Sequence, residues 1–181
     1  AERAGFPTGL VNMVTGRTGE IGAELTSNPI VRKVTFTGST PVGKQLMAEC
    51  AATVKRTSME LGGNAPFIVF DDADIDAAVQ GAMVSKYRNA GQTCVCSNRI
   101  IVQAGIYDEF AAKLKQAALE LVLGNGADEG VTVGPLIDEK AATGVCEFID
   151  DAVAKGASVT LGGGPSELGG SFVNPTILTG V

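Results

Sequence analysis

The chain of 181 residues contains no histidine. Imidazole is the usual general base beside a catalytic serine or cysteine, and it is also the commonest metal ligand. Its absence excludes Ser/His and Cys/His catalysis within this polypeptide alone. A general base in this chain must therefore be a carboxylate or another side chain.

Positive charge is also scarce, since 14 Lys and Arg residues against 20 Asp and Glu residues give a net charge of −6. With no local Lys/Arg cluster, this balance argues against a nucleic-acid partner. No apolar run is long enough to span a bilayer, and the first residues show no signal-peptide pattern, so we expect no membrane association. The four scattered cysteines form no disulfide framework, which favours a reducing, cytoplasmic location.

Hydrophobic residues make up 45% and charged residues 19% of the chain, as is typical of a globular protein. We expect strands at 11–14, 31–37, 59–61, 65–70, 99–103 and 159–161, and helices at 20–25, 41–48, 75–87, 107–121 and 139–155. This alternation predicts an α/β fold in which crossover helices join parallel strands. The opening A-E-R-A-G-F-P is typical of a last helical turn, and the closing P-T-I-L-T-G-V of a strand. We therefore expect a segment of a longer protein.

The stretch F-T-G-S-T-P-V-G follows a predicted strand and begins a predicted helix. Gly38 and Gly43 would let the backbone approach a phosphate, and Ser39 adds a hydroxyl donor. The amino end of the helix offers free N–H groups and the positive end of its dipole. The stretch does not match G-x-G-x-x-G, so an ordinary strand-to-helix turn remains an alternative.

The stretch M-E-L-G-G-N places Glu60 between two apolar residues and before two glycines. Burial there would raise the pKa of a carboxyl group from about 4.3 toward the range of a general base. The alternative is a strand glutamate that faces solvent or pairs with Lys55 or Arg56.

Two cysteines, Cys94 and Cys96, lie one residue apart in N-A-G-Q-T-C-V-C-S-N-R. Zinc binding by Cys94 and Cys96 would need further soft ligands, and the chain has no histidine, so we expect no metal. A disulfide between residues i and i+2 conflicts with ordinary disulfide geometry. Cys96 fits buried packing. Cys94, between a predicted helix and a predicted strand after Gly91-Gln92-Thr93, is the candidate nucleophile.

Met59-Glu60-Leu61-Gly62-Gly63-Asn64 and Gly91-Gln92-Thr93-Cys94 together resemble the paired glutamate and cysteine signatures of the aldehyde dehydrogenase superfamily. The resemblance implies an aldehyde dehydrogenase-like α/β fold, with part of a Rossmann-type NAD(P)-binding domain at 1–61 and part of the cysteine-bearing catalytic domain at 62–181. It implies a catalytic role for Cys94 and Glu60, and cofactor contacts by Gly38, Ser39, Val42, Gly43 and Leu61. The cofactor would be NAD or NADP, and the full-length protein a homo-oligomer.

The stretch S-K-Y-R-N-A-G-Q-T-C-V-C-S-N-R is similar to that of succinate-semialdehyde and glutarate-semialdehyde dehydrogenases. On the last turn of the predicted helix, Arg88 could bind a distal carboxylate of the substrate bidentately. The alternative is a solvated arginine at a helix C-terminus. The resemblance implies oxidation of succinate semialdehyde to succinate through a thiohemiacetal and a thioester on Cys94. Glutarate semialdehyde or another aldehyde, cofactor-free acyl transfer and an inactive fragment are the alternatives.

Overall fold

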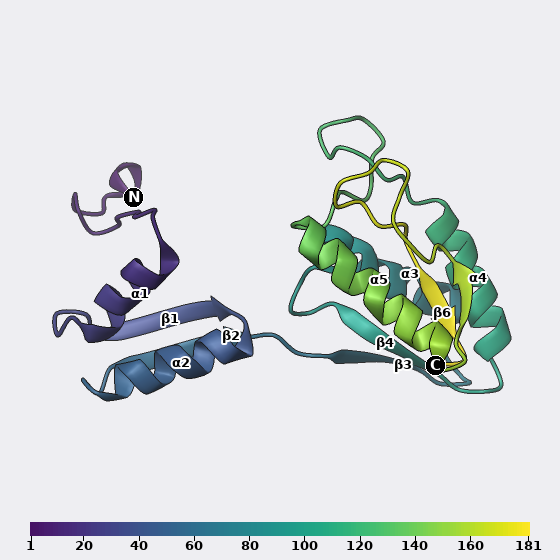
Figure 1. The fold of residues 1–181 in the computed structure, drawn as a ribbon, viewed down its shortest axis with the longest axis horizontal. Coiled ribbons are helices and arrows are strands. Elements are labelled where there is room, and N and C mark those ends of the chain that lie inside the picture. The colour runs from purple at the N-terminus through teal and green to yellow at the C-terminus, as the bar shows by residue number, and fades with distance from the viewer. The chain divides into compact units, whose positions relative to one another are not determined.

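Helices and strands alternate along the chain in the computed structural model, which describes residues 1–181 (Figure 1). The predicted α/β class is confirmed. The chain divides into two units, Ala1–Gly62 and Gly63–Val181, and each is described by itself. The expected domain boundary between residues 61 and 62 is adjacent to this division, and the assignment of a cofactor domain and a catalytic domain stays a prediction.

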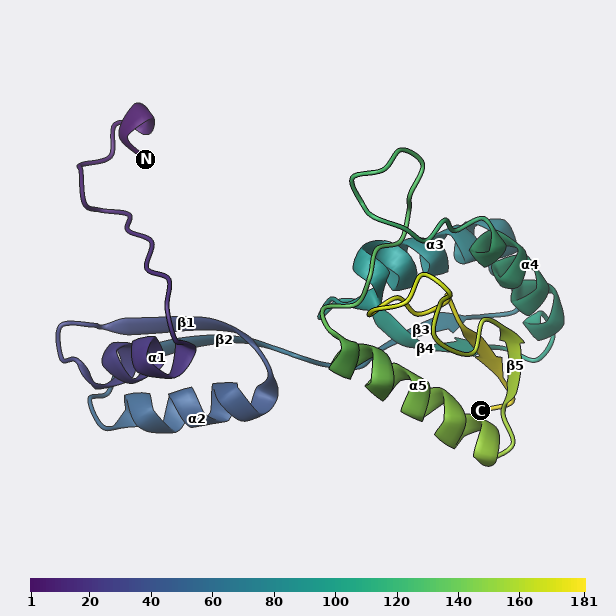
Figure 2. The same cartoon turned by 45° about the horizontal axis from the view of Figure 1, so that its top comes forward.

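The first unit is built on two parallel strands joined by a helix. Its elements after the 3-10 turn Glu2–Ala4 are α1 (Thr18–Ser27), β1 (Lys33–Gly38), α2 (Thr40–Ala51) and β2 (Arg56–Leu61). Helix α2 packs against both strands and against α1 (Figures 1 and 2). Thr26 of α1 is buried, and its Oγ donates a hydrogen bond to Glu49 Oε2 of α2 at 2.9 Å. The two helices are thus tied by a polar contact as well as by packing.

The second unit repeats the strand–helix–strand arrangement and adds further elements to it. These are β3 (Ala65–Val69), α3 (Ile75–Tyr87), the 3-10 turn Arg88–Gly91, β4 (Ser97–Val102), α4 (Tyr107–Leu119), α5 (Glu139–Ala154), β5 (Ser158–Leu161) and β6 (Ile177–Thr179). Strands β3 and β4 pair in parallel. Figure 2 shows α3 and α4 on one side of these strands and α5 on the other. The core between β3, α3, α4 and β6 contains Val69, Val79, Ala82, Phe110, Leu114, Ala118 and Ile177.

Aspartates begin the two helices of the second unit that have side-chain caps. Asp74 Oδ1 accepts a hydrogen bond from the Ala77 N–H at 3.1 Å, and Asp138 Oδ1 accepts one from the Ala141 N–H at 2.7 Å. Each carboxylate satisfies a free donor and complements the positive end of the helix dipole. These local contacts explain why the predicted starts of both helices, at residues 75 and 139, are correct.

Two expectations about local structure are wrong. Residues 11–14 form no strand, because no neighbouring strand pairs with them, and Val11, Met13 and Val14 are exposed. Strands β5 and β6 pair antiparallel, so the sheets are not all parallel. The helical turn expected at the first residues is confirmed as a 3-10 turn, Glu2–Ala4, which Gly5 closes with a φ of 81°. No helix of the chain has the length and apolar character that crossing a membrane would require.

Candidate active site

The carboxyl ends of β1 and β2 bring the predicted cofactor residues of the first unit together. The parallel register sets Gly38 beside Leu61. Gly43, in the first turns of α2, is buried against the same leucine. A Cβ at Gly43 would lie 2.5 Å from Leu61 Cδ2, so only glycine fits there without displacing the leucine. The close packing of α2 on the end of β2 therefore depends on a residue without a side chain.

The amino end of α2 has backbone donors without partners. Ser39 is the N-cap residue, but its side chain makes no capping hydrogen bond. The N–H groups of Thr40 and Val42 donate no hydrogen bond within the chain, and Pro41 has no N–H to donate. Unpaired N–H groups at the positive end of a helix dipole suit an anion such as a pyrophosphate. The residues at this turn therefore fit a dinucleotide.

Glu60 is not buried as the sequence led us to expect. It is exposed, whereas its neighbours Met59 and Leu61 are half-buried, because successive side chains of a strand point to opposite faces. No ion pair or hydrogen bond of its carboxylate exists within the chain, and the Lys55 ammonium instead donates to the Asn28 and Val31 carbonyls at 2.6 and 2.9 Å. Within the first unit Glu60 is thus a free, solvent-facing carboxylate at the end of β2.

Cys94 lies in a tight turn between the 3-10 turn and β4, and it is exposed. The Cys96 N–H closes this turn by donating to the Thr93 carbonyl at 3.2 Å. The Cys94 N–H itself donates no hydrogen bond within the chain, so it is free to bind an oxyanion. The arrangement presents a reachable thiol beside an unused backbone donor.

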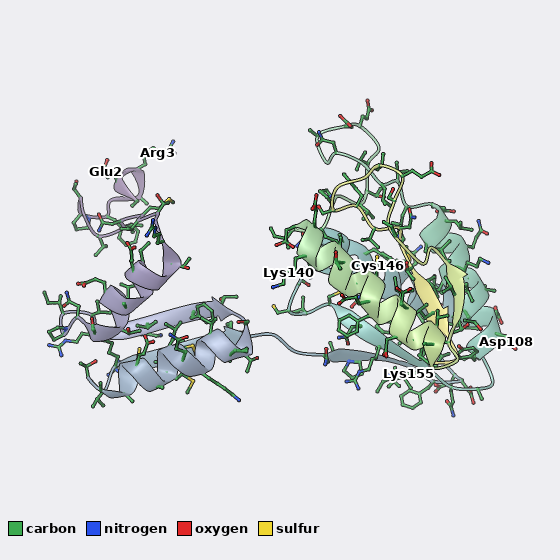
Figure 3. All side chains as sticks on the ribbon, viewed as in Figure 1. Glu2, Arg3, Asp108, Lys140, Cys146 and Lys155 are labelled. Atoms are coloured by element: carbon green, nitrogen blue, oxygen red, sulfur yellow. The ribbon has the colours of Figure 1, made fainter.

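All four cysteines are free thiols, and they differ in exposure. Cys96 is buried, and its Sγ donates to the Lys86 carbonyl at 3.2 Å. Cys50 is buried in α2, and Cys146 lies half-buried on α5, where Figure 3 labels it. Cys94 is therefore the one fully exposed thiol of the chain.

Arg88 lies just beyond α3 rather than on its last turn. The helix ends at Tyr87, and Arg88 has an extended ψ of 129° because the chain turns sharply there. Its side chain is exposed and makes no hydrogen bond or ion pair within the chain. The guanidinium is therefore available to an external anion.

Sequence reasoning gave no role to Gln92, two residues before Cys94. Its Oε1 accepts a hydrogen bond from the Ile137 N–H at 2.8 Å. The partner lies 45 residues further along the chain, so no local pattern could have indicated the contact. The left-handed backbone of the three residues before Gln92 was likewise not predicted.

An apolar hollow of the second unit does not contain the predicted site residues. It has a volume of about 990 Å³ and runs between β4, α4 and β6. Its lining is mainly apolar, with Ile100, Phe110 and Leu114 among the residues that form it. Neither Cys94 nor Arg88 lines it, so size alone is a poor guide to the chemistry of this chain.

In the first unit, a helix with unpaired N–H groups at its amino end follows a strand. In the second unit, an exposed thiol lies in a tight turn. These two features define a class of α/β protein. Residues 1–181 match the family model described as the aldehyde dehydrogenase family. The chain belongs to the aldehyde dehydrogenase family, which confirms the resemblance seen in its motifs.

The relatives are substantially longer than this chain. The glutarate-semialdehyde dehydrogenase of Pseudomonas aeruginosa is 66% identical over 100% of this chain and 38% of its own length. The NADP(+) succinate-semialdehyde dehydrogenase GabD of Escherichia coli is 62% identical over 100% of this chain and 38% of its own. The crystal structure of succinate-semialdehyde dehydrogenase from Burkholderia pseudomallei matches with a TM-score of 0.96 and 59% identity, over 99% of this chain and 37% of that one. The chain thus spans less than two fifths of these proteins.

Proposed function

We propose that the protein to which this chain belongs oxidises succinate semialdehyde to succinate with NAD or NADP, using Cys94 as the nucleophile. The observation that carries the proposal is the exposed Cys94 thiol beside its own unpaired N–H. The family and the names of the relatives support the reaction class. Glutarate semialdehyde is the alternative substrate, because the similar proteins include dehydrogenases named for either aldehyde.

The reaction begins at Cys94. Its thiolate adds to the aldehyde carbon, a C–S bond forms, and the carbonyl electron pair moves onto oxygen to give a thiohemiacetal. The free Cys94 N–H is positioned in the same turn to donate to that oxyanion. The second unit therefore supplies the nucleophile and one oxyanion donor for the first chemical step.

When bound, NAD or NADP supplies the acceptor for the hydride that the thiohemiacetal carbon loses, a role that no side chain can fill. The residues proposed to hold it are Gly38, Ser39, Val42, Gly43 and Leu61, at the unpaired amino end of α2 and the adjoining end of β2. The first unit would then be the cofactor-binding part and the second the catalytic part.

Glu60 is proposed to complete the cycle. The acyl group remains on Cys94 as a thioester, and the Glu60 carboxylate removes a proton from the water that attacks it. The C–S bond breaks, the carboxylic acid leaves, and the thiol is regenerated. The carboxylate makes no ion pair within the chain, so it is available for this task in the full-length protein.

Replacing Cys94 tests the reaction. In the full-length protein Cys94→Ala should abolish aldehyde-dependent formation of reduced nicotinamide while leaving cofactor affinity nearly unchanged. Cys146→Ala is the matched control, because this half-buried thiol lies on α5. Normal turnover in Cys94→Ala would exclude the proposal. Release of product from an activated ester without cofactor, in the absence of any dehydrogenase activity, would favour acyl transfer instead.

Arg88 tests the substrate. Loss of a charge-assisted hydrogen bond costs about 1.5–3 kcal/mol, so Arg88→Ala should lower kcat/KM for succinate semialdehyde about ten- to over a hundredfold. An uncharged aldehyde of similar length should lose little. Arg88→Lys should recover part of the activity, since a point charge cannot reproduce the planar fork. Equal losses for both aldehydes would show that Arg88 does not bind the distal carboxylate.

A further inference from the structure

The backbone immediately before Cys94 adopts a conformation that L-residues rarely hold. Asn89, Ala90 and Gly91 have φ values of 55°, 52° and 76° in succession. Two of the three residues carry a Cβ, which is unfavourable in this left-handed region, most clearly for an alanine with no polar side chain. Such a run persists only where surrounding contacts hold it.

Gln92 supplies those contacts at the end of the run. Its N–H and its Nε2 both donate to the Asn89 carbonyl, at 3.0 and 3.4 Å, and Asn89 Nδ2 donates back to the Gln92 carbonyl at 3.2 Å. These bonds close the left-handed turn on itself. Both the main chain and the side chain of Gln92 are therefore engaged just before Cys94.

The same side chain also ties the turn to a distant segment. Gln92 Oε1 accepts from the Ile137 N–H at 2.8 Å, and its Nε2 lies 3.5 Å from the Pro135 carbonyl oxygen. This segment is fixed in turn, because the Leu136 N–H donates to the Ser171 carbonyl at 3.0 Å and Ser171 Oγ donates to the Leu136 carbonyl at 2.7 Å. Gln92 thus has a rigid anchor.

The other side of Cys94 is held independently. Cys96 Sγ donates to the Lys86 carbonyl at 3.2 Å, and the Ser97 N–H donates to Ser85 Oγ at 3.3 Å. These contacts fasten the start of β4 to the end of α3. β4 is also paired with β3, where Ser97 lies opposite Ala65, so the chain after Cys94 is held by the strand and by α3. On the side before Cys94, Gln92 makes the side-chain bond to a distant segment.

We propose that Gln92 is a positioning residue for Cys94, acting chiefly through its bond to the Ile137 N–H. The proposal rests on the proposed function, in which Cys94 is the nucleophile. Gln92 holds the left-handed turn and fixes where the thiol and the Cys94 N–H lie with respect to an incoming aldehyde. Small displacements of a reacting group cost much rate, so removal of this tie should lower kcat more than it alters substrate binding.

Two variants of the full-length enzyme and one control test the proposal. Gln92→Ala removes all the side-chain bonds. Gln92→Glu keeps an oxygen facing the Ile137 N–H, but it sets a carboxylate oxygen in place of Nε2, opposite the Asn89 and Pro135 carbonyl oxygens. Gln103→Ala is the matched control, because Gln103 Oε1 also accepts from a distant backbone N–H, that of Asp71 at 2.8 Å, but at the other end of β4.

The measurements are kcat per titrated active site, KM for the aldehyde, the pH profile of kcat, and amide hydrogen exchange of residues 89–96. Gln92→Ala should accelerate exchange in this segment and lower kcat per active site about ten- to a hundredfold, with KM changed much less. Gln92→Glu should recover part of that loss through the bond to the Ile137 N–H. Gln103→Ala should match the parent in all four measurements.

An unchanged kcat per active site in Gln92→Ala would overturn the proposal. A fall in the number of active sites without a change in kcat per site would show a role in folding alone and would overturn it equally. The Cys94→Ala variant separates this result from the proposed function. If that variant still turns over, Cys94 is not the nucleophile and both proposals fail; if it is inactive, an unaffected Gln92→Ala removes only the positioning role.

Discussion

A single methyl group added at Gly43 should disturb the proposed cofactor site through Leu61. The Cβ of Gly43→Ala would lie 2.5 Å from Leu61 Cδ2, 3.2 Å from Cδ1 and 3.5 Å from Cγ. All three neighbours belong to the branched end of one leucine and none to the backbone. Leu61 must therefore leave its position, while α2 and β2 can keep theirs.

Two opposing effects set the size of the change. Alanine is favoured over glycine inside a helix by about 1 kcal/mol, whereas pushing the half-buried Leu61 side chain off its rotamer costs about 0.5–1.5 kcal/mol. Gly22 in α1 is the matched control, because a Cβ there would meet only Leu46 Cδ2 at 4.0 Å, an ordinary contact. Gly22→Ala should therefore show the helix gain alone, and the two variants should differ by about 0.5–1.5 kcal/mol in free energy of unfolding.

Urea denaturation measures the free energy of unfolding, and cofactor titration of the full-length protein measures the affinity for the cofactor. Gly43→Ala should weaken cofactor binding, because Leu61 adjoins Gly38 in the register of β1 and β2; Gly22→Ala should not. Leu61→Ala in the Gly43→Ala background removes the obstructing side chain, so the two substitutions should couple favourably. A Gly43→Ala variant as stable as Gly22→Ala, or additive effects in the double variant, would refute this reasoning.

Three further outcomes are expected from single substitutions in the full-length protein. Glu60→Gln should give a burst of reduced cofactor followed by a slow steady rate, because an amide cannot take a proton from water; an unchanged steady rate would place the base elsewhere. After peroxide treatment, Cys96→Ser and the parent should recover equally with added thiol, because Cys96 is buried; recovery in the parent alone would reveal a resolving role. Burial raises the pKa of Tyr87 from 10.0 to about 12. The unfolded phenol therefore loses its proton first as the pH rises, so stability should fall by about 2–3 kcal/mol between those values, and urea denaturation of Tyr87→Phe should show a smaller fall.

The sequence alone determined the family, the α/β class and most of the elements. Residues 75–87 were predicted as a helix and form α3, because the capping aspartate Asp74 is a local signal. Local signals also predicted the start of α2 near Pro41 and the ends of β1 and β2. The motif around Cys94 was also local, so the candidate nucleophile could be named from its neighbours.

Only the tertiary structure decided what depends on partners far along the chain. The apolar residues at 11–14 could form a strand by propensity, but no neighbouring strand accepts them. No short stretch of the sequence indicates the direction of β6 against β5, the exposure of Glu60 or the bond from the Ile137 N–H to Gln92. A strand's direction and burial, and a hydrogen bond across 45 residues, are properties of two segments at once. A pattern within one segment can therefore indicate its type of element, but not which residues of the two segments contact each other.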